Sequence, residues 1–162
     1  MKMTAKSIML ASTLTLTVCH QTIANAHDVF AQSLGAYKTV ATTTTVNYGS
    51  HNPTDYYQIT CSDDGTGVPA YLLIAVRDIT AGTSVLSATI QKGLLSRQTT
   101  DVTGADTAYS PMISLYGKPG PGIYNVIVSK NLYPTRNYDM QYHCMTADNL
   151  HTGTSIALKL NE

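Results

Sequence analysis

The sequence predicts an all-β chain that folds as a single antiparallel β-sandwich, jelly-roll or immunoglobulin-like, with about eight strands. Apolar and polar residues alternate in short blocks, as they do in strands that have one buried face. Clusters of Gly, Pro, Asn and Asp separate the blocks and leave no room for a helix of ordinary length. Cys61 and Cys144 each lie in a block with this alternation, where they can link the two sheets.

The first 26 residues are typical of a signal peptide. A basic start and an apolar stretch, Ile8–Val18, precede the small residues Ala24 and Ala26. Cleavage after Ala26 leaves one domain, residues 27–162, whose first residue is His27. We therefore expect a periplasmic or secreted protein that has no stable membrane insertion after cleavage.

Two other roles for this leader are weighed against cleavage. A retained membrane helix needs roughly 18 to 20 apolar residues, whereas this run is shorter and is interrupted by Thr and Ser. A lipid anchor on Cys19 calls for a small residue before the cysteine, and Val18 stands there. Cleavage after Ala26 is the interpretation that the residues favour.

The mature part divides into blocks that we predict as strands. They are, in chain order, Tyr37–Asn47, Tyr56–Cys61, Ala70–Asp78, Ser84–Lys92, Ser110–Tyr116, Ile123–Lys130, 138–144 and 156–160. Ala70–Asp78 and Ile123–Lys130 are almost continuously apolar, so they are predicted to be central strands covered on both sides.

Alternation assigns side chains to faces within these strands. Tyr57, Ile59 and Cys61 share one face of their strand, and Ile156, Leu158 and Leu160 share one face of theirs. In the strand 138–144 one face carries Tyr138, Met140, Tyr142 and Cys144, and the opposite, solvent-facing side carries Asp139, Gln141 and His143. Both cysteines are thus predicted to point inward.

The cysteine pair predicts one disulfide between Cys61 and Cys144 in an oxidising compartment. Two isolated cysteines so far apart lack the spacing of a zinc site. The mature chain has eight Lys and Arg against ten Asp and Glu and no basic patch with interleaved aromatics, so a nucleic-acid partner is not expected.

Two resemblances support a sandwich. Tyr142-x-Cys144 is similar to the tyrosine corner of immunoglobulin-like domains, although the chain has no Trp. Gly120–Val128 followed by Asn137–Tyr142 resembles the closing strands of bacterial pre-peptidase C-terminal domains, and Thr54–Ile59 resembles their opening strand. That resemblance implies a secreted jelly-roll-like sandwich that assists binding or secretion beside a catalytic domain.

The sharpest chemical feature is the predicted mature terminus, because His27 would carry a free α-amine beside its imidazole. These two nitrogens can chelate copper, and a second histidine would complete a tetragonal site of the kind found in lytic polysaccharide monooxygenases and some periplasmic copper carriers. Candidate partners are His51, His143 and His151, with Asp28 or Asp148 as oxygen ligands. The plainer interpretation makes His27 only a cleavage point and His143 a solvent-facing strand residue.

The remaining motifs favour structural roles. Ser62–Gly67 has oxygens that suit Ca²⁺, but Asp-Gly turns between strands are routine. The chain has no Gly-x-Ser-x-Gly elbow, and no free thiol remains in the mature chain after the disulfide forms. We therefore expect a non-catalytic binding or accessory module with an unidentified protein or glycan partner. The alternative is a periplasmic copper-binding protein that uses His27. A small hydrolase or oxidase is a third hypothesis.

Overall fold

The structure is a computed structural model that describes residues 27–34, 38–39, 50–51, 53–131 and 134–161. Within these ranges the chain forms strands and no helix. The strands are β1 (His27–Leu34), β2 (Lys38–Thr39), β3 (Ser50–His51), β4 (Thr54–Ser62), β5 (Pro69–Asp78), β6 (Leu86–Lys92), β7 (Leu95–Asp101), β8 (Gly122–Lys130), β9 (Arg136–Thr146) and β10 (Gly153–Leu160). The signal-peptide prediction falls on residues 1–26, outside the described residues.

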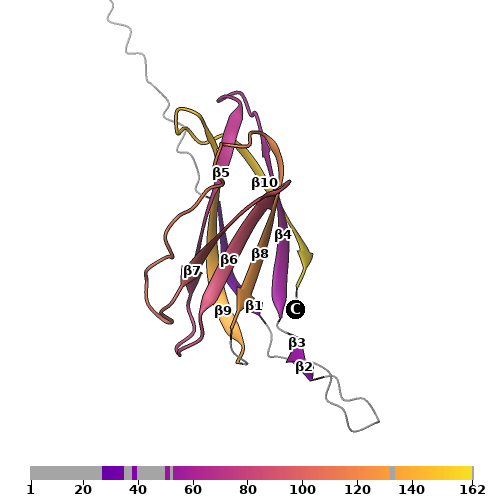
Figure 1. Ribbon diagram of the computed structural model, residues 1–162. Coiled ribbons are helices and arrows are strands. Elements are labelled where there is room, and N and C mark those ends of the chain that lie inside the picture. The colour runs from indigo at the N-terminus through magenta and orange to yellow at the C-terminus, as the bar shows by residue number, and fades with distance from the viewer. Residues whose placement is uncertain (1–26, 35–37, 40–49, 52, 132–133, 162) are drawn as a thin grey trace, which may run out of the picture.

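Two antiparallel sheets make the sandwich, as Figure 1 shows. One has three strands in the order β1-β9-β5, and the other has five in the order β10-β4-β8-β6-β7. The short strands β2 and β3 pair only with each other. The all-β sandwich predicted from the sequence is confirmed, and eight strands lie in its two main sheets.

The core lies between the two sheets and is built by alternation. Ile59 in β4, Val126 in β8 and Met140 in β9 are fully buried, while their neighbours in sequence point outward or are partly exposed. Burial of such side chains stabilises each by roughly 1.5–3 kcal/mol relative to exposure. This buried layer holds the two outer faces in fixed positions.

The predicted disulfide is present between Cys61 in β4 and Cys144 in β9. It joins the two sheets across the core, and its Cα atoms are 5.4 Å apart. Both sulfur-bearing residues are buried, as the alternation predicted.

One predicted strand, in the segment between β7 and β8, is absent from the structure. Ser110–Tyr116 is not a strand, because only Ile113 forms a bridge with β5, where it exchanges two 2.9 Å hydrogen bonds with Ile74. Pro111 has no N–H to donate to a continuous ladder. The segment still extends the edge of the three-stranded sheet through the Ser110 N–H, which donates to the carbonyl of Val76.

Three further predictions need correction. β5 was predicted to be a central strand, but it is the outermost strand on one side of its sheet. β8 is central, as predicted, but it is not covered on both sides, because Ile123 and Ile127 are exposed on its outer side. In β10 an irregularity after Leu158 places Leu160 opposite Tyr56, on the outer face. The predicted strand Tyr37–Asn47 lies almost wholly outside the described residues.

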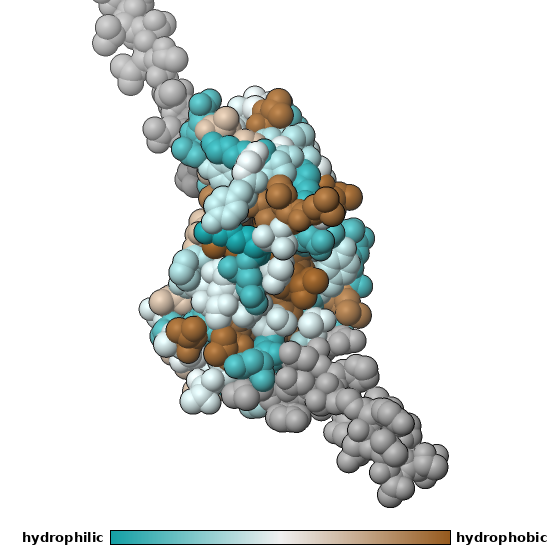
Figure 2. Space-filling model, viewed as in Figure 1, coloured by the Kyte–Doolittle hydropathy of each residue, from teal (hydrophilic) through white to brown (hydrophobic). Residues whose placement is uncertain are grey.

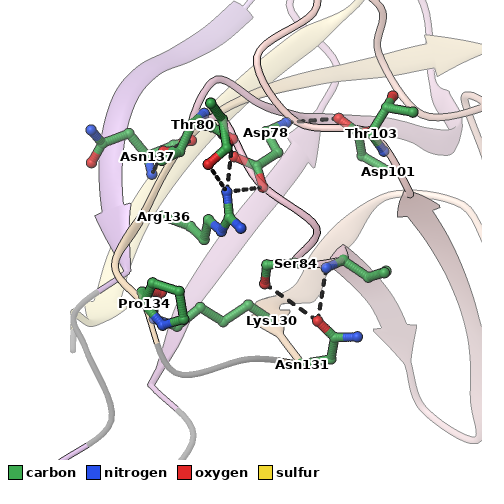
Figure 3. A network of polar contacts seen from close by, with 12 residues as sticks. Asp78, Thr80, Ser84, Asp101, Thr103, Lys130, Asn131, Pro134, Arg136 and Asn137 are labelled. Atoms are coloured by element: carbon green, nitrogen blue, oxygen red, sulfur yellow. Dashed lines mark hydrogen bonds and ion pairs between the residues drawn. The ribbon is translucent and has the colours of Figure 1, made fainter.

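A network of buried charges closes one end of the sandwich (Figure 3). The Arg136 guanidinium in β9 donates to the carbonyls of Thr80 and Ala81 and lies 3.6 Å from the Asp78 carboxylate. Asp101 accepts a 2.7 Å hydrogen bond from the Asp78 N–H. Because buried charges are costly unless they are paired, this network fixes the loop after β5 against β7 and β9.

Candidate functional site

The outer face of the five-stranded sheet is the first candidate. The strands β4, β6, β7 and β8 direct alternate side chains outward, and none of these outward residues is charged. We call this surface the neutral face. Its members are Thr54, Tyr56, Gln58, Thr60, Ser87, Thr89, Gln91, Ser96, Gln98, Thr100, Ile123, Asn125, Ile127 and Ser129. On β10, Ser155, Ala157 and Leu160 continue it, and Lys159 lies at the irregularity of that edge strand.

The charged residues of these four strands all lie on the inner side, and two of them illustrate how they are held there. Lys92 lies over the ring of Tyr124 at 4.3 Å and donates to the carbonyl of Gly120. Arg97 donates to the carbonyl of Ser114. Solvent-facing strand positions usually carry charges that keep a sheet soluble and prevent association. Here that face is left uncharged, and we infer that it suits an uncharged contact.

A shallow cavity of about 380 Å³ lies on the neutral face. It is lined by Thr54, Tyr56, Gln91, Asn125, Ile127 and Leu160. The Tyr56 hydroxyl donates to the Asn125 side-chain oxygen at 2.7 Å, and the Gln58 amide donates to the Tyr56 hydroxyl at 3.0 Å. Figure 2 shows hydrophobic side chains, in brown, set among hydrophilic ones in teal and intermediate ones in white on the face toward the viewer.

The second candidate is a group of histidines at the edge of β9, which we call the histidine corner. β1 begins at His27, opposite Tyr142, and its ring stacks on that tyrosine at 5.8 Å between centroids. His151 pairs with Met145, and its ring lies 4.8 Å from the His143 ring. Asp28 pairs with Gln141 and so shares the outer face with His143.

His143 is buried, which corrects the solvent-facing position predicted from the sequence. It is only 7% exposed, and its Nδ1 atom has no hydrogen-bond partner. The Oδ1 atom of Asp28 is also buried without a partner. Burial lowers the pKa of His143, and the nearby His151 lowers it further. The imidazole is therefore held neutral, the form that binds metal ions.

The structure brings together several of the predicted copper ligands, but not all. Asp28 shares the outer face with His143, whose ring contacts that of His151. The ring of His27 instead stacks on Tyr142, which belongs to the opposite, inner face. Asp148 lies in the exposed turn before His151, and the His51 side chain and Ala26 lie outside the described residues. In the described part of the chain, no three His, Cys, Asp or Glu side chains are placed to hold a metal ion together.

The loop Ser62–Gly67 uses its carboxylates internally. Asp63 accepts hydrogen bonds from the N–H groups of Gly65 and Gly67, and Asp64 accepts one from Thr66. These bonds lower the pKa of Asp64, with the Thr66 N–H as the main cause. The geometry is that of turns closed by Asp side chains, and it supports the structural interpretation of this loop.

Comparisons with known proteins do not place this chain in a family. No family model, no curated protein and no solved structure matches it. Over the described ranges there is no helix with the length and apolar character needed to cross a membrane.

The neutral face is the feature that sequence reasoning missed. Its signal was present, since every outward position of Thr54–Thr60 and of Ile123–Ser129 is uncharged. The pattern was not recognised because a face is assembled from strands far apart in the chain, and β7 was not predicted at all.

Proposed function

We propose that this chain is an exported, non-catalytic binding module whose neutral face holds an uncharged glycan. The observation that carries the proposal is the separation of charge across the five-stranded sheet. All charged residues of β4, β6, β7 and β8 point inward, while the outward side offers amides, hydroxyls and aliphatic side chains. The signal-peptide sequence and the inter-sheet disulfide support an exported role.

The chemistry of the cavity favours a neutral polyhydroxylated ligand. Amides and hydroxyls both donate and accept hydrogen bonds, so Gln91, Asn125 and Tyr56 can exchange bonds with sugar hydroxyls. Ile127 and Leu160 offer apolar contact to the C–H faces of a sugar ring. An ionic ligand would find no opposite charge on this face, which disfavours acidic or basic partners.

Affinity electrophoresis through gels that contain uncharged polysaccharides tests the proposal. We expect dextran, amylose or galactomannan to retard the protein, and we expect anionic alginate not to retard it. Gln91→Ala and Asn125→Ala should weaken the retarding interaction at least tenfold because they remove donors and acceptors from the cavity.

Gln98→Ala is the matched control. Gln98 lies on the same face, on β7, but does not line the cavity. Its substitution should change binding by less than twofold. Absence of retardation by every neutral polysaccharide, or equal effects of Gln91→Ala and Gln98→Ala, would reject the proposal.

A further inference from the structure

The outward side chains of the five-stranded sheet are arranged in rows that cross the strands. Asn125 in β8 lies directly between Gln58 in β4 and Gln91 in β6. The same row ends at the two edges of the sheet, at Ala157 in β10 and at Ser96 in β7. We call these five positions the amide row, and Figure 1 shows the strands that it crosses, from β10 to β7.

Hydrogen bonds between neighbouring side chains fix which way the amides of the row point. The Asn125 side-chain oxygen accepts hydrogen bonds from the Tyr56 hydroxyl at 2.7 Å and from the Gln58 amide at 3.5 Å. The Gln91 amide nitrogen donates to the carbonyl of Gly93 at 3.4 Å. In the part of the chain that the structure describes, these contacts leave Oε1 of Gln58, the amide nitrogen of Asn125 and Oε1 of Gln91 without a partner. The row therefore presents an acceptor, a donor and an acceptor on three successive strands.

Apolar side chains border the amide row on both sides. Ile123 and Ile127 lie two residues before and after Asn125 on β8, so they share its outer face, and they are 53% and 38% exposed. Neighbouring strands are about 4.8 Å apart, so the three amides span roughly 10 Å and the whole row roughly 19 Å. A chain of sugars laid along the row would meet one amide at each strand and would place C–H groups over the two isoleucines.

Both ends of the amide row are open. Ala157 and Ser96 are exposed, and their small side chains form no wall at the edge strands β10 and β7. A pocket that is closed on one side selects the end of a chain. An open row instead lets a longer chain continue past both edges of the sheet.

We propose, on the basis of the glycan binding proposed above, that the neutral face binds the interior of a long, linear, uncharged polysaccharide that lies along the amide row and crosses the strands. Several adjoining sugar units then contribute to affinity, and neither end of the chain is recognised. The shallow cavity lined by Gln91 and Asn125 is one part of this longer site, since Gln58 lies in the row but outside the cavity.

Competition with free oligosaccharides in the affinity gels tests the length of the site. The competitors are isomaltooligosaccharides in dextran gels, maltooligosaccharides in amylose gels and mannooligosaccharides in galactomannan gels. We expect a hexasaccharide to release the protein at a concentration at least tenfold lower than a disaccharide does, because it reaches amides on more strands. A bulky group on the reducing end of the hexasaccharide should change its potency less than twofold. Equal potency of the two lengths, or loss of potency on capping the end, would overturn the inference and leave the proposed glycan binding intact.

Two variants test the direction of the chain. Gln58→Ala removes an amide of the row on β4, whereas Ser129→Ala removes a hydroxyl on β8, beyond Ile127 along the strand from Asn125. Gln58→Ala should reduce the advantage of the hexasaccharide over the disaccharide at least threefold, and Ser129→Ala should leave it unchanged. An unchanged advantage in folded Gln58→Ala, or an equal or larger loss in Ser129→Ala, would overturn the inference.

Two measurements keep the outcomes separate. Urea unfolding of each variant checks that the fold is retained, and the length dependence of the wild-type protein provides the test if Gln58→Ala does not fold. Absence of retardation by every neutral polysaccharide would reject the proposed function itself, and the inference about the amide row with it.

Discussion

At the residue scale, buried tyrosines join the two sheets through their hydroxyl groups. The hydroxyls of Tyr57 in β4 and Tyr138 in β9 are 2.6 Å apart, and Tyr138 also donates to the buried carboxylate of Asp55 at 2.6 Å. On the same inner layer, the Tyr124 hydroxyl donates to the carbonyl of Gly120. Burial raises the pKa of Tyr57 and of Tyr124 to about 12, and it also raises the pKa of Tyr138. These phenols are protonated donors in the folded state.

The raised pKa values predict a loss of stability at alkaline pH. Below pH 10 the phenols are protonated in both states, so their full contribution to stability is present there. Between pH 10 and 12 the unfolded chain releases protons that folded Tyr57 and Tyr124 retain, so the free energy of unfolding falls, on the order of 2 kcal/mol for each. Urea unfolding at intervals from pH 8 to pH 12 measures this slope.

Tyr57→Phe is the variant that isolates one phenol. It should be less stable than the wild type at pH 8, because it loses the hydrogen bond with Tyr138. Its stability should then decline less steeply above pH 10. Parallel slopes for the two proteins would contradict the assignment of the alkaline loss to Tyr57.

At the element scale, two loops approach each other so closely that one position must be glycine. Gly104 forms an isolated bridge with Asp78, and a Cβ atom placed on Gly104 would lie 2.3 Å from the carbonyl oxygen of Thr80. Gly104→Ala therefore requires one backbone segment to move, and it should lower the free energy of unfolding by more than about 2 kcal/mol.

Gly93→Ala is the matched comparison for Gly104→Ala. Gly93 lies in the hairpin turn between β6 and β7 with φ of 58°, and a Cβ atom there would meet nothing within 4 Å. The cost should be about 1 kcal/mol, from backbone conformation alone. Urea unfolding of both variants measures the difference in the free energy of unfolding. Equal losses would show that the backbone at Gly104 and Thr80 can move apart with no loss of stability.

The elements also show which information the sequence carries. Strands with strong alternation or a continuous apolar run, such as β4, β5, β8 and β9, were predicted within a few residues because one buried face imposes a period of two. β7 was missed because Leu95–Asp101 is mostly polar and shows no clear alternation. It forms a strand because it pairs with β6 in a hairpin. β1 was missed for a related reason, since it is an edge strand with Phe30 exposed and an irregularity before Gln32.

The candidate sites depend on contacts that local patterns do not encode. The face of His143 followed from alternation, but its burial depends on neighbours from other segments, including His151. Leu160 was assigned to the wrong face because alternation assumes a regular strand, and β10 is irregular after Leu158. Local periodicity thus predicts faces, whereas tertiary packing decides which faces are covered.

At the scale of the whole molecule, the disulfide is the covalent link between the two sheets. It joins β4, in the five-stranded sheet, to β9, the middle strand of the other sheet, and closes a loop of 83 residues. In the chain-entropy model a loop of this length restricts the unfolded chain by up to about 4.5 kcal/mol. The double variant Cys61→Ala with Cys144→Ala should therefore unfold at a lower urea concentration, with a loss of about 2–5 kcal/mol.

The same variant separates the roles of the bond and of the core. The residues around the bridge, including Ile59 and Leu72, are fully buried in the apolar layer between the sheets, so the folded sandwich should persist in the variant. Because the bridge acts mainly on the unfolded chain, the dependence of the free energy of unfolding on urea should become steeper as that chain expands. A loss below 1 kcal/mol would instead mean that the apolar layer between the sheets supplies nearly all the stability. In that case both outer faces would keep their geometry under reducing conditions.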